Sequence, residues 1–114
     1  MNYVLKNIQH PHKLYPIRKA DTFFARLVGL MGQKKTSTGL LLEPCQSIHT
    51  CFMLFPLDVI FLDANNRVVK VIYHLKPWRF TLFYFKAKKV VEFPIGIIPA
   101  HIKEKEEWEV ECLS

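Results

Sequence analysis

The sequence predicts an α+β fold, in which a mostly antiparallel sheet curls toward a barrel and one principal helix packs against it. Three observations lead to this prediction. One segment carries apolar residues at helical spacing, several others are short β-branched and aromatic runs bounded by turn residues, and 50% of the 114 residues are hydrophobic. We expect a single domain over residues 1–114, with residues 1–19 as an N-terminal extension or edge strand and residues 20–114 as the core.

The principal helix is predicted over residues 21–32. Its apolar residues recur three or four positions apart, Asp21 or Thr22 can cap its start, and Gly32 can end it. The apolar residues at this spacing are Phe23, Phe24, Leu27, Leu30 and Met31.

Strands are predicted in the most apolar part of the chain. Residues 39–42 form a short buried strand that Pro44 closes. Residues 57–62 and 68–73 are rich in β-branched and aromatic residues, and the turn-forming cluster at residues 63–67 lies between them. These two runs are predicted to form an antiparallel hairpin.

Further β structure is predicted toward the C-terminus. Residues 80–85 and 90–93 read as strands, and the basic residues around the first of them would limit aggregation of its aromatic side chains. Residues 100–106 are predicted to contain a helical turn. Residues 108–113 alternate apolar and acidic side chains, which indicates a closing, half-exposed strand.

The charge is distributed unevenly along the chain. Residues 1–90 carry fourteen basic and four acidic residues, a balance of +10, whereas residues 91–114 carry two basic and six acidic residues, a balance of −4. A basic body attracts nucleic acid or an anionic surface. The basic residues are nevertheless scattered singly and are not interleaved with aromatics at a motif spacing, which disfavours nucleic-acid binding.

The three cysteines indicate a reducing compartment, because their number is odd and no C-x-x-C spacing occurs. The N-terminal residues contain no apolar stretch long enough for a secretory signal. The most apolar stretch, residues 51–62, is interrupted by Pro56 and Asp58 and is shorter than the ~20 residues of a spanning helix. We therefore expect a cytoplasmic protein without a membrane span.

Five ordered motifs resemble a known family, called domain of unknown function 192. They are R-x-x-G-L-M at residues 26–31, G-L-L-L at 39–42, S-I-H-T-C-F-M-L-F-P-L-D-V-I-F-L-D at 47–63, L-K-P-W-R at 75–79 and V-E-F-P-I-G at 91–96. The resemblance implies a compact mixed α/β domain whose biochemical role is not settled. The chain departs from the family near residues 104–106, where a Gly-Asp pair is usual and Glu-Lys-Glu stands instead.

Asp58 and Arg26 are the first candidate site. Asp58 sits in an apolar strand, and a buried carboxylate needs a partner. Arg26, at the margin of the apolar stripe of the predicted helix, can hold it bidentately. The pair has two interpretations: an ion pair that joins helix to sheet, or a general acid or base in a cleft with Arg26 as its anion anchor.

The central motif also supplies soft metal ligands. If the segment is extended, His49, Cys51 and Met53 project to one face, with Cys45 nearby, and Cu(I) or zinc would suit such a set. Neither C-x-x-C nor H-x-x-x-H spacing is present, so the sequence predicts neither a metal site nor a cofactor. His49 is also a candidate base, for Cys45 or Cys51 or for a hydrolytic reaction, although a core histidine bonded to a backbone carbonyl is the more common case.

Trp78 and Arg79 follow Pro77 in a loop, where an aromatic beside a guanidinium forms either a recognition surface or a lid over the sheet. The first functional hypothesis is a small non-enzymatic binding or accessory domain that binds a small ligand or a protein partner, as a monomer or weak oligomer. The second is a small hydrolase-like enzyme, and the third is binding to nucleic acid or an anionic surface. The residues of the binding hypothesis are Arg26, His49, Met53, Asp58, Trp78 and Arg79.

Overall fold

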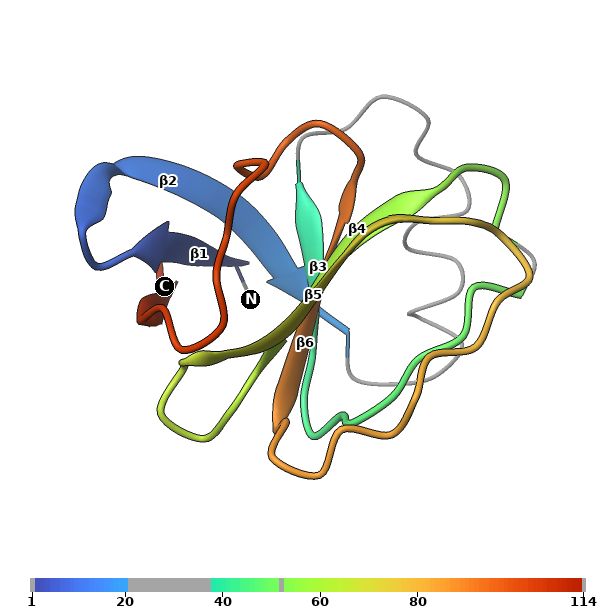
Figure 1. The fold of residues 1–114 in the computed structure, drawn as a ribbon. Helices are drawn as coiled ribbons and strands as arrows, with labels where there is room; N and C mark the ends of the chain where they lie inside the picture. Colours follow the sequence, from blue (N-terminus) through green and yellow to red (C-terminus); the bar gives the residue numbers. More distant parts are fainter. Residues whose placement is uncertain (1, 21–37, 52, 114) are drawn as a thin grey trace.

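The computed structural model describes residues 2–20, 38–51 and 53–113. These residues form a seven-stranded sheet in the order β5-β4-β6-β3-β2-β1-β7 (Figure 1). Every neighbouring pair is antiparallel except β2 and β3, which are parallel. The strands are β1 (Asn2–Asn7), β2 (His10–Lys19), β3 (Gly39–Leu42), β4 (Leu57–Leu62), β5 (Val68–Leu75), β6 (Lys89–Pro94) and β7 (Trp108–Cys112).

The predicted α+β class is wrong, because the described residues form an all-β fold and contain no helix. The predicted principal helix over residues 21–32 lies outside the described residues. The sequence also understated the strand content near the N-terminus, where β2 runs for ten residues. Its two prolines and two histidines suggest a loop locally. Pairing with β1 on one side and β3 on the other overrides that local preference.

The predicted strands at residues 39–42, 57–62 and 90–93 are confirmed, and the hairpin of β4 and β5 forms as expected. Two predictions are wrong. Residues 80–85 contain no strand, since only Phe80 forms an isolated bridge, with His49. Residues 100–106 contain turns and no helical turn. Both segments are exposed for most of their length, so neither has the packing that would extend a short local preference into a regular element.

The three central strands β3, β4 and β6 are buried on both faces. Because successive side chains of a strand point to opposite faces, each strand contributes to two separate cores. One core contains Leu40, Leu42, Leu57, Val59, Phe61 and Val90 together with loop residues, and the other contains Leu41, Ile60, Leu62, Val91, Phe93, Tyr15, Ile17 and Trp108. This explains why the central motif is a continuous apolar run.

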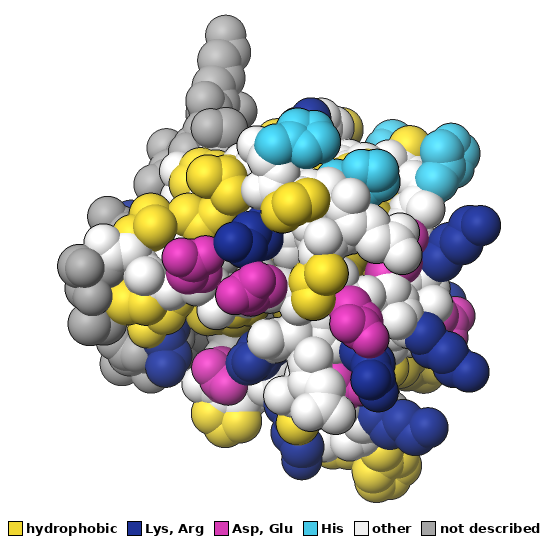
Figure 2. All heavy atoms as spheres, turned by 90° about the vertical axis from the view of Figure 1, so that its left-hand side faces the viewer, with side chains coloured by type: hydrophobic (Ala, Val, Ile, Leu, Met, Phe, Trp, Pro, Cys, Tyr) yellow, Lys and Arg dark blue, Asp and Glu magenta, His cyan; other side chains and the backbone are white. Residues whose placement is uncertain are grey.

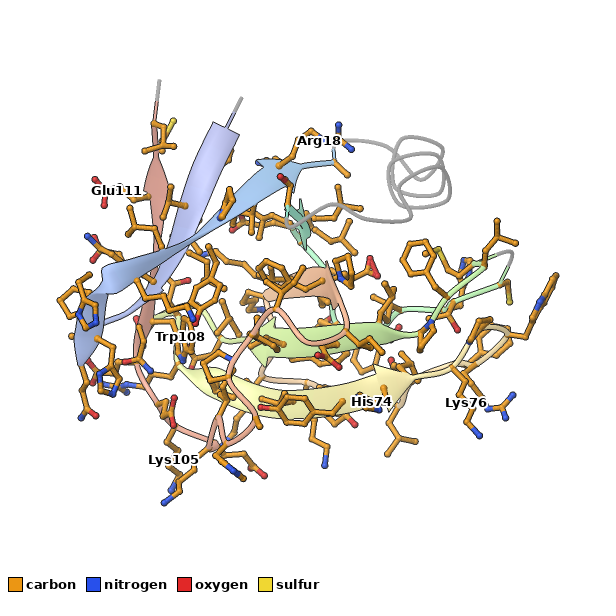
Figure 3. The ribbon with its side chains drawn as sticks, turned by 90° about the horizontal axis from the view of Figure 1, so that it is seen from above. Arg18, His74, Lys76, Lys105, Trp108 and Glu111 are labelled. Atoms are coloured by element: carbon orange, nitrogen blue, oxygen red, sulfur yellow. The ribbon has the colours of Figure 1, made fainter. Side chains whose placement is uncertain are left out.

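The sheet curls into a half-barrel whose two edge strands, β5 and β7, meet at one end. The amide of Val68 donates to the carbonyl oxygen of Glu106 at 2.9 Å, and the amide of Lys105 donates to the carbonyl oxygen of Val68 at 2.7 Å. The amide of Trp108 donates to the carbonyl oxygen of Asn66 at 2.9 Å. Figure 3 shows that Lys105 and Trp108 lie at this closed end, whereas Lys76 lies at the far end of the molecule.

Two irregular segments, residues 44–56 and 76–88, cover one face of the sheet, and we call their described residues the loop face. They contribute Cys45, Ile48, Met53 and Ala87 to the core beneath them. The two segments run antiparallel and are hydrogen-bonded to each other: the amides of residues 50, 81 and 84 donate to the carbonyl oxygens of residues 79, 48 and 46. The loop face lies on the right in Figure 1, opposite β1 and β7.

Candidate functional site

Asp58 lies on β4, only 2% exposed, and both of its carboxylate oxygens accept hydrogen bonds from the backbone. The amide of His74 donates to Oδ1 at 2.9 Å, and the amide of Gly96 donates to Oδ2 at 3.1 Å. Both donors have left-handed backbone conformations, with φ of 56° and 85°. The ladder between β4 and β5 shifts register at this position, so the carboxylate takes the place of a missing backbone acceptor.

The partner that the sequence proposed for Asp58 was Arg26, which lies outside the described residues. The burial that the proposal required is present, and the two amides supply compensating donors for the charge. Among the described side chains, no buried nitrogen or oxygen atom lacks a hydrogen-bond partner. Asp58 therefore joins β4, β5 and the loop after β6 through its own hydrogen bonds.

Tyr73 also anchors the loop that follows β6. Its hydroxyl donates to the carbonyl oxygen of Pro99 at 2.7 Å and accepts from the amide of Ile102 at 3.1 Å. Burial raises the pKa of Tyr73, which keeps the hydroxyl protonated and able to donate. A pocket of about 380 Å³ lies where this loop meets the N-terminal hairpin, and its lining includes Tyr15 and Trp108 but none of the predicted binding residues.

Thr50 organises the loop that carries Trp78 and Arg79. Its side chain is fully buried; the hydroxyl donates to the carbonyl oxygen of Lys76 at 2.6 Å and accepts from the amide of Arg79 at 2.9 Å. The carbonyl oxygen of Thr50 accepts from the amide of Trp78 at 3.0 Å. One residue thus fixes the backbone on both sides of Trp78.

The loop holds Trp78 outward in a left-handed conformation with φ of 62°, and the residue is 57% exposed. A bulky side chain rarely adopts this conformation, which costs of order 1–3 kcal/mol and persists only where the surroundings determine it. The exposure argues against the alternative in which Trp78 seals the sheet as a lid. Arg79 is exposed beside it.

His49 and Met53 lie in the other segment of the loop face. Met53 is buried in the core, and the half-buried His49 places its ring 6.0 Å from that of Phe80. Nδ1 of His49 accepts from the amide of Cys51 at 3.3 Å, so the imidazole serves the local backbone. The thiol of Cys45 donates to the carbonyl oxygen of Ser47 at 3.1 Å. No cluster of three metal-binding side chains occurs among the described residues.

The structure therefore gathers four of the predicted residues, His49, Met53, Trp78 and Arg79, into the loop face, while Asp58 is bonded elsewhere. Sequence reasoning missed Thr50, because a single threonine in an apolar run carries no signal of its own. It also missed that the apolar run at residues 80–85 is exposed. The lysine and arginine residues around that run were the available signal for exposure.

Replacing Thr50 with valine should lower the free energy of unfolding by about 2 kcal/mol, since the change keeps the volume but removes the buried hydroxyl that bonds the carbonyl oxygen of Lys76 and the amide of Arg79. Denaturant unfolding measures this loss. Thr50→Ser is the matched control, because it keeps the hydroxyl and removes one methyl group, so it should cost about 1 kcal/mol. Equal stability of the valine variant and wild type would show that the hydroxyl does not fix this loop.

The curled sheet and its loop layer define a class of small all-β domain, and a crystal structure shares this fold. It is a protein of unknown function from Novosphingobium aromaticivorans, which matches with a TM-score of 0.74 at 18% identity and covers 98% of this chain and 84% of that chain. The chain belongs to the DUF192 family, an Uncharacterized ACR, whose family model matches residues 4–108. The resemblance is thereby confirmed, and the match begins well before residue 20.

Archaeal relatives support the assignment. The chain is 39% identical to a UPF0127 protein of Thermococcus sibiricus over 104 residues, which are 83% of this chain and 67% of the relative. It is also 39% identical to a UPF0127 protein of Pyrococcus horikoshii over 100 residues, which are 81% of this chain and 86% of the relative. In the part of the chain that the structure describes, no helix could span a membrane.

Proposed function

We propose that this protein is a small non-enzymatic binding domain and that the loop face is its binding surface. The observation that carries the proposal is the exposed Trp78, held in a strained backbone conformation by the buried Thr50. Strain of this kind collects at functional sites, and an exposed tryptophan beside an arginine is the composition of an interaction hot spot. Neither feature is needed for the core.

The bonding of Asp58 favours binding over hydrolysis. A general base must offer an oxygen to substrate within hydrogen-bond reach, and Asp58 is almost fully buried with both oxygens accepting from amides. His49 uses Nδ1 as an acceptor from the backbone. These contacts support structural roles for both residues.

The thiol inventory supports a cytoplasmic location, which we propose together with a monomeric or weakly associating state. Cys45, Cys51 and Cys112 form no disulfide with one another, and Cys45 is buried while Cys112 is exposed. Exposed thiols persist in reducing compartments. A binding domain of this kind would meet its partner in the cytoplasm.

The proposal is tested with defined probes against the wild-type protein, namely mixed-composition lipid vesicles, a mixed-sequence oligonucleotide and a displayed peptide library. At least one probe should bind, and Trp78→Ala and Arg79→Ala should weaken that binding about tenfold, the loss expected for a hot-spot residue. Leu113→Ala is the matched control, because Leu113 is exposed to the same degree but lies outside the loop face.

Two results would contradict the proposal. One is binding that is unaffected by both loop-face variants. The other is turnover of ester or phosphate-ester substrates that Asp58→Asn abolishes while the protein stays folded, which would favour the hydrolase.

A further inference from the structure

The loop face carries an unusual concentration of exposed apolar side chains. Six of the ten large hydrophobic residues exposed in the described part of the chain belong to it. Single exposed hydrophobics are normal, but a contiguous group marks an interaction surface. The six are Leu54, Trp78, Phe80, Leu82, Phe83 and Phe85, with exposures from 54% to 82%.

The two segments themselves carry basic residues and no acidic ones, and Lys86 lines a pocket together with Asp63 and Glu104. The sequence of residues 44–56 and 76–88 contains no aspartate or glutamate, whereas Lys76, Arg79, Lys86 and Lys88 are all exposed. The opposite side of the molecule differs, because acidic side chains lie among the lysines and arginines there (Figure 2). Figure 3 shows Lys76 at the end of the molecule away from Glu111.

Aromatic and leucine side chains rimmed by lysine and arginine match the chemistry of an anionic lipid surface. Tryptophan and phenylalanine insert at the level of the headgroups, and cations beside them are attracted to anionic lipids. Lys76, Arg79 and Lys88, which are exposed on two segments without a carboxylate, provide the charge complementarity. The cytoplasmic leaflet carries the matching negative potential.

Two observations favour lipid over single-stranded nucleic acid or an added peptide strand. The rings of Phe83 and Phe85 contact each other edge to face at 79°, and the ring of Phe80 lies against His49, so parallel faces for stacked bases are not presented. The amides of Thr81 and Tyr84 already donate to the neighbouring segment. Leucines also add nothing to base stacking but do add area buried in a bilayer.

We infer that the loop face docks this protein peripherally onto an anionic lipid bilayer, with its apolar side chains in the headgroup region and Lys76, Arg79 and Lys88 against the lipid phosphates. This inference rests on the proposed function and names the partner of the same surface. Because part of the attraction is electrostatic, docking should weaken as salt screens the cations.

The test is co-sedimentation of the full chain with vesicles of phosphatidylglycerol and phosphatidylcholine, and with vesicles of phosphatidylcholine alone. We expect binding to the anionic vesicles only, weakened by salt. The double variant Phe80→Ser/Phe85→Ser should lose at least tenfold in partition coefficient, because each phenylalanine removes apolar area from water. Lys76→Gln/Lys88→Gln should also weaken binding, and Lys13→Gln/Leu113→Ser, which changes exposed residues outside the loop face, is the matched control and should bind as wild type does.

Tryptophan fluorescence gives a second readout that does not depend on sedimentation. Docking should shift the emission of the exposed Trp78 to the blue while the buried Trp108 stays unchanged, and Trp78→Phe should remove the shift. Equal binding to neutral vesicles, or no vesicle binding combined with Trp78-dependent binding of oligonucleotide or peptide, would overturn this inference and leave the proposed function standing. Vesicle binding lost only in the control variant would overturn both.

Discussion

Replacing Asp58 with alanine should lower the free energy of unfolding by about 3–5 kcal/mol. Two amides, those of His74 and Gly96, would lose a charged acceptor inside the protein, and each such hydrogen bond contributes about 1.5–3 kcal/mol. The loss would act on three elements at once, since β4, β5 and the loop after β6 meet at this carboxylate. Urea unfolding measures the effect.

Two further variants sharpen the interpretation of Asp58. Asp58→Asn keeps one acceptor but turns a donor toward the second amide, so about half of the loss is expected. Glu104→Ala is the control, because Glu104 is an exposed carboxylate. In the alanine variant, hydrogen exchange of the amides of His74 and Gly96 should accelerate. Unchanged stability and unchanged exchange would remove the structural role and revive the catalytic interpretation.

Replacing Trp108 with alanine should cost about 3–5 kcal/mol, the range for loss of a buried tryptophan. Trp108 is 2% exposed, its ring centroid lies 5.9 Å from that of Tyr15, and its indole Nε1 donates to Glu106 Oε1 at 3.3 Å. The residue starts β7 at the closed end of the half-barrel. Truncation would therefore remove both core packing and part of the contact between the edge strands.

The chain contains its own matched control for this prediction. Trp78→Ala removes the same side chain from an exposed position and should change the free energy of unfolding by less than about 1 kcal/mol. Thermal or denaturant unfolding of the two variants compares them directly. If both substitutions cost the same, Trp78 would be a structural lid and the loop face would lose its principal residue.

Local sequence patterns were sufficient for the strands whose own residues determine their structure. β4 and β5 are β-branched and aromatic runs around an evident turn, and β7 shows the alternation of a half-exposed strand. β2 could not be predicted in this way, because its strand conformation depends on pairing with β1, which precedes it, and with β3, which lies about twenty residues further along the chain. The histidines and prolines of β2 indicate a local conformational preference, and they do not indicate which strands pair with β2.

The candidate site was predictable in composition and not in arrangement. Trp78 and Arg79 stand out because they follow a proline in a loop, and Asp58 stands out because it interrupts an apolar run. Nothing in the sequence indicates that the amides of residues 74 and 96 donate hydrogen bonds to Asp58, since both come from left-handed backbone positions far along the chain. The role of Thr50 is likewise visible only after two segments are brought together.

The pairing of the first strand with the last has a consequence for synthesis of the chain. β1 hydrogen-bonds to β7, with Tyr3 opposite Cys112, and the closed end of the half-barrel needs residues 105–108. A growing chain on the ribosome therefore holds β1 with one edge open until residues 108–112 have emerged. Such long-range pairing slows folding. We expect the domain to complete its fold only once residues 108–112 have emerged, and its nascent chain to expose the β1 edge to chaperones until then.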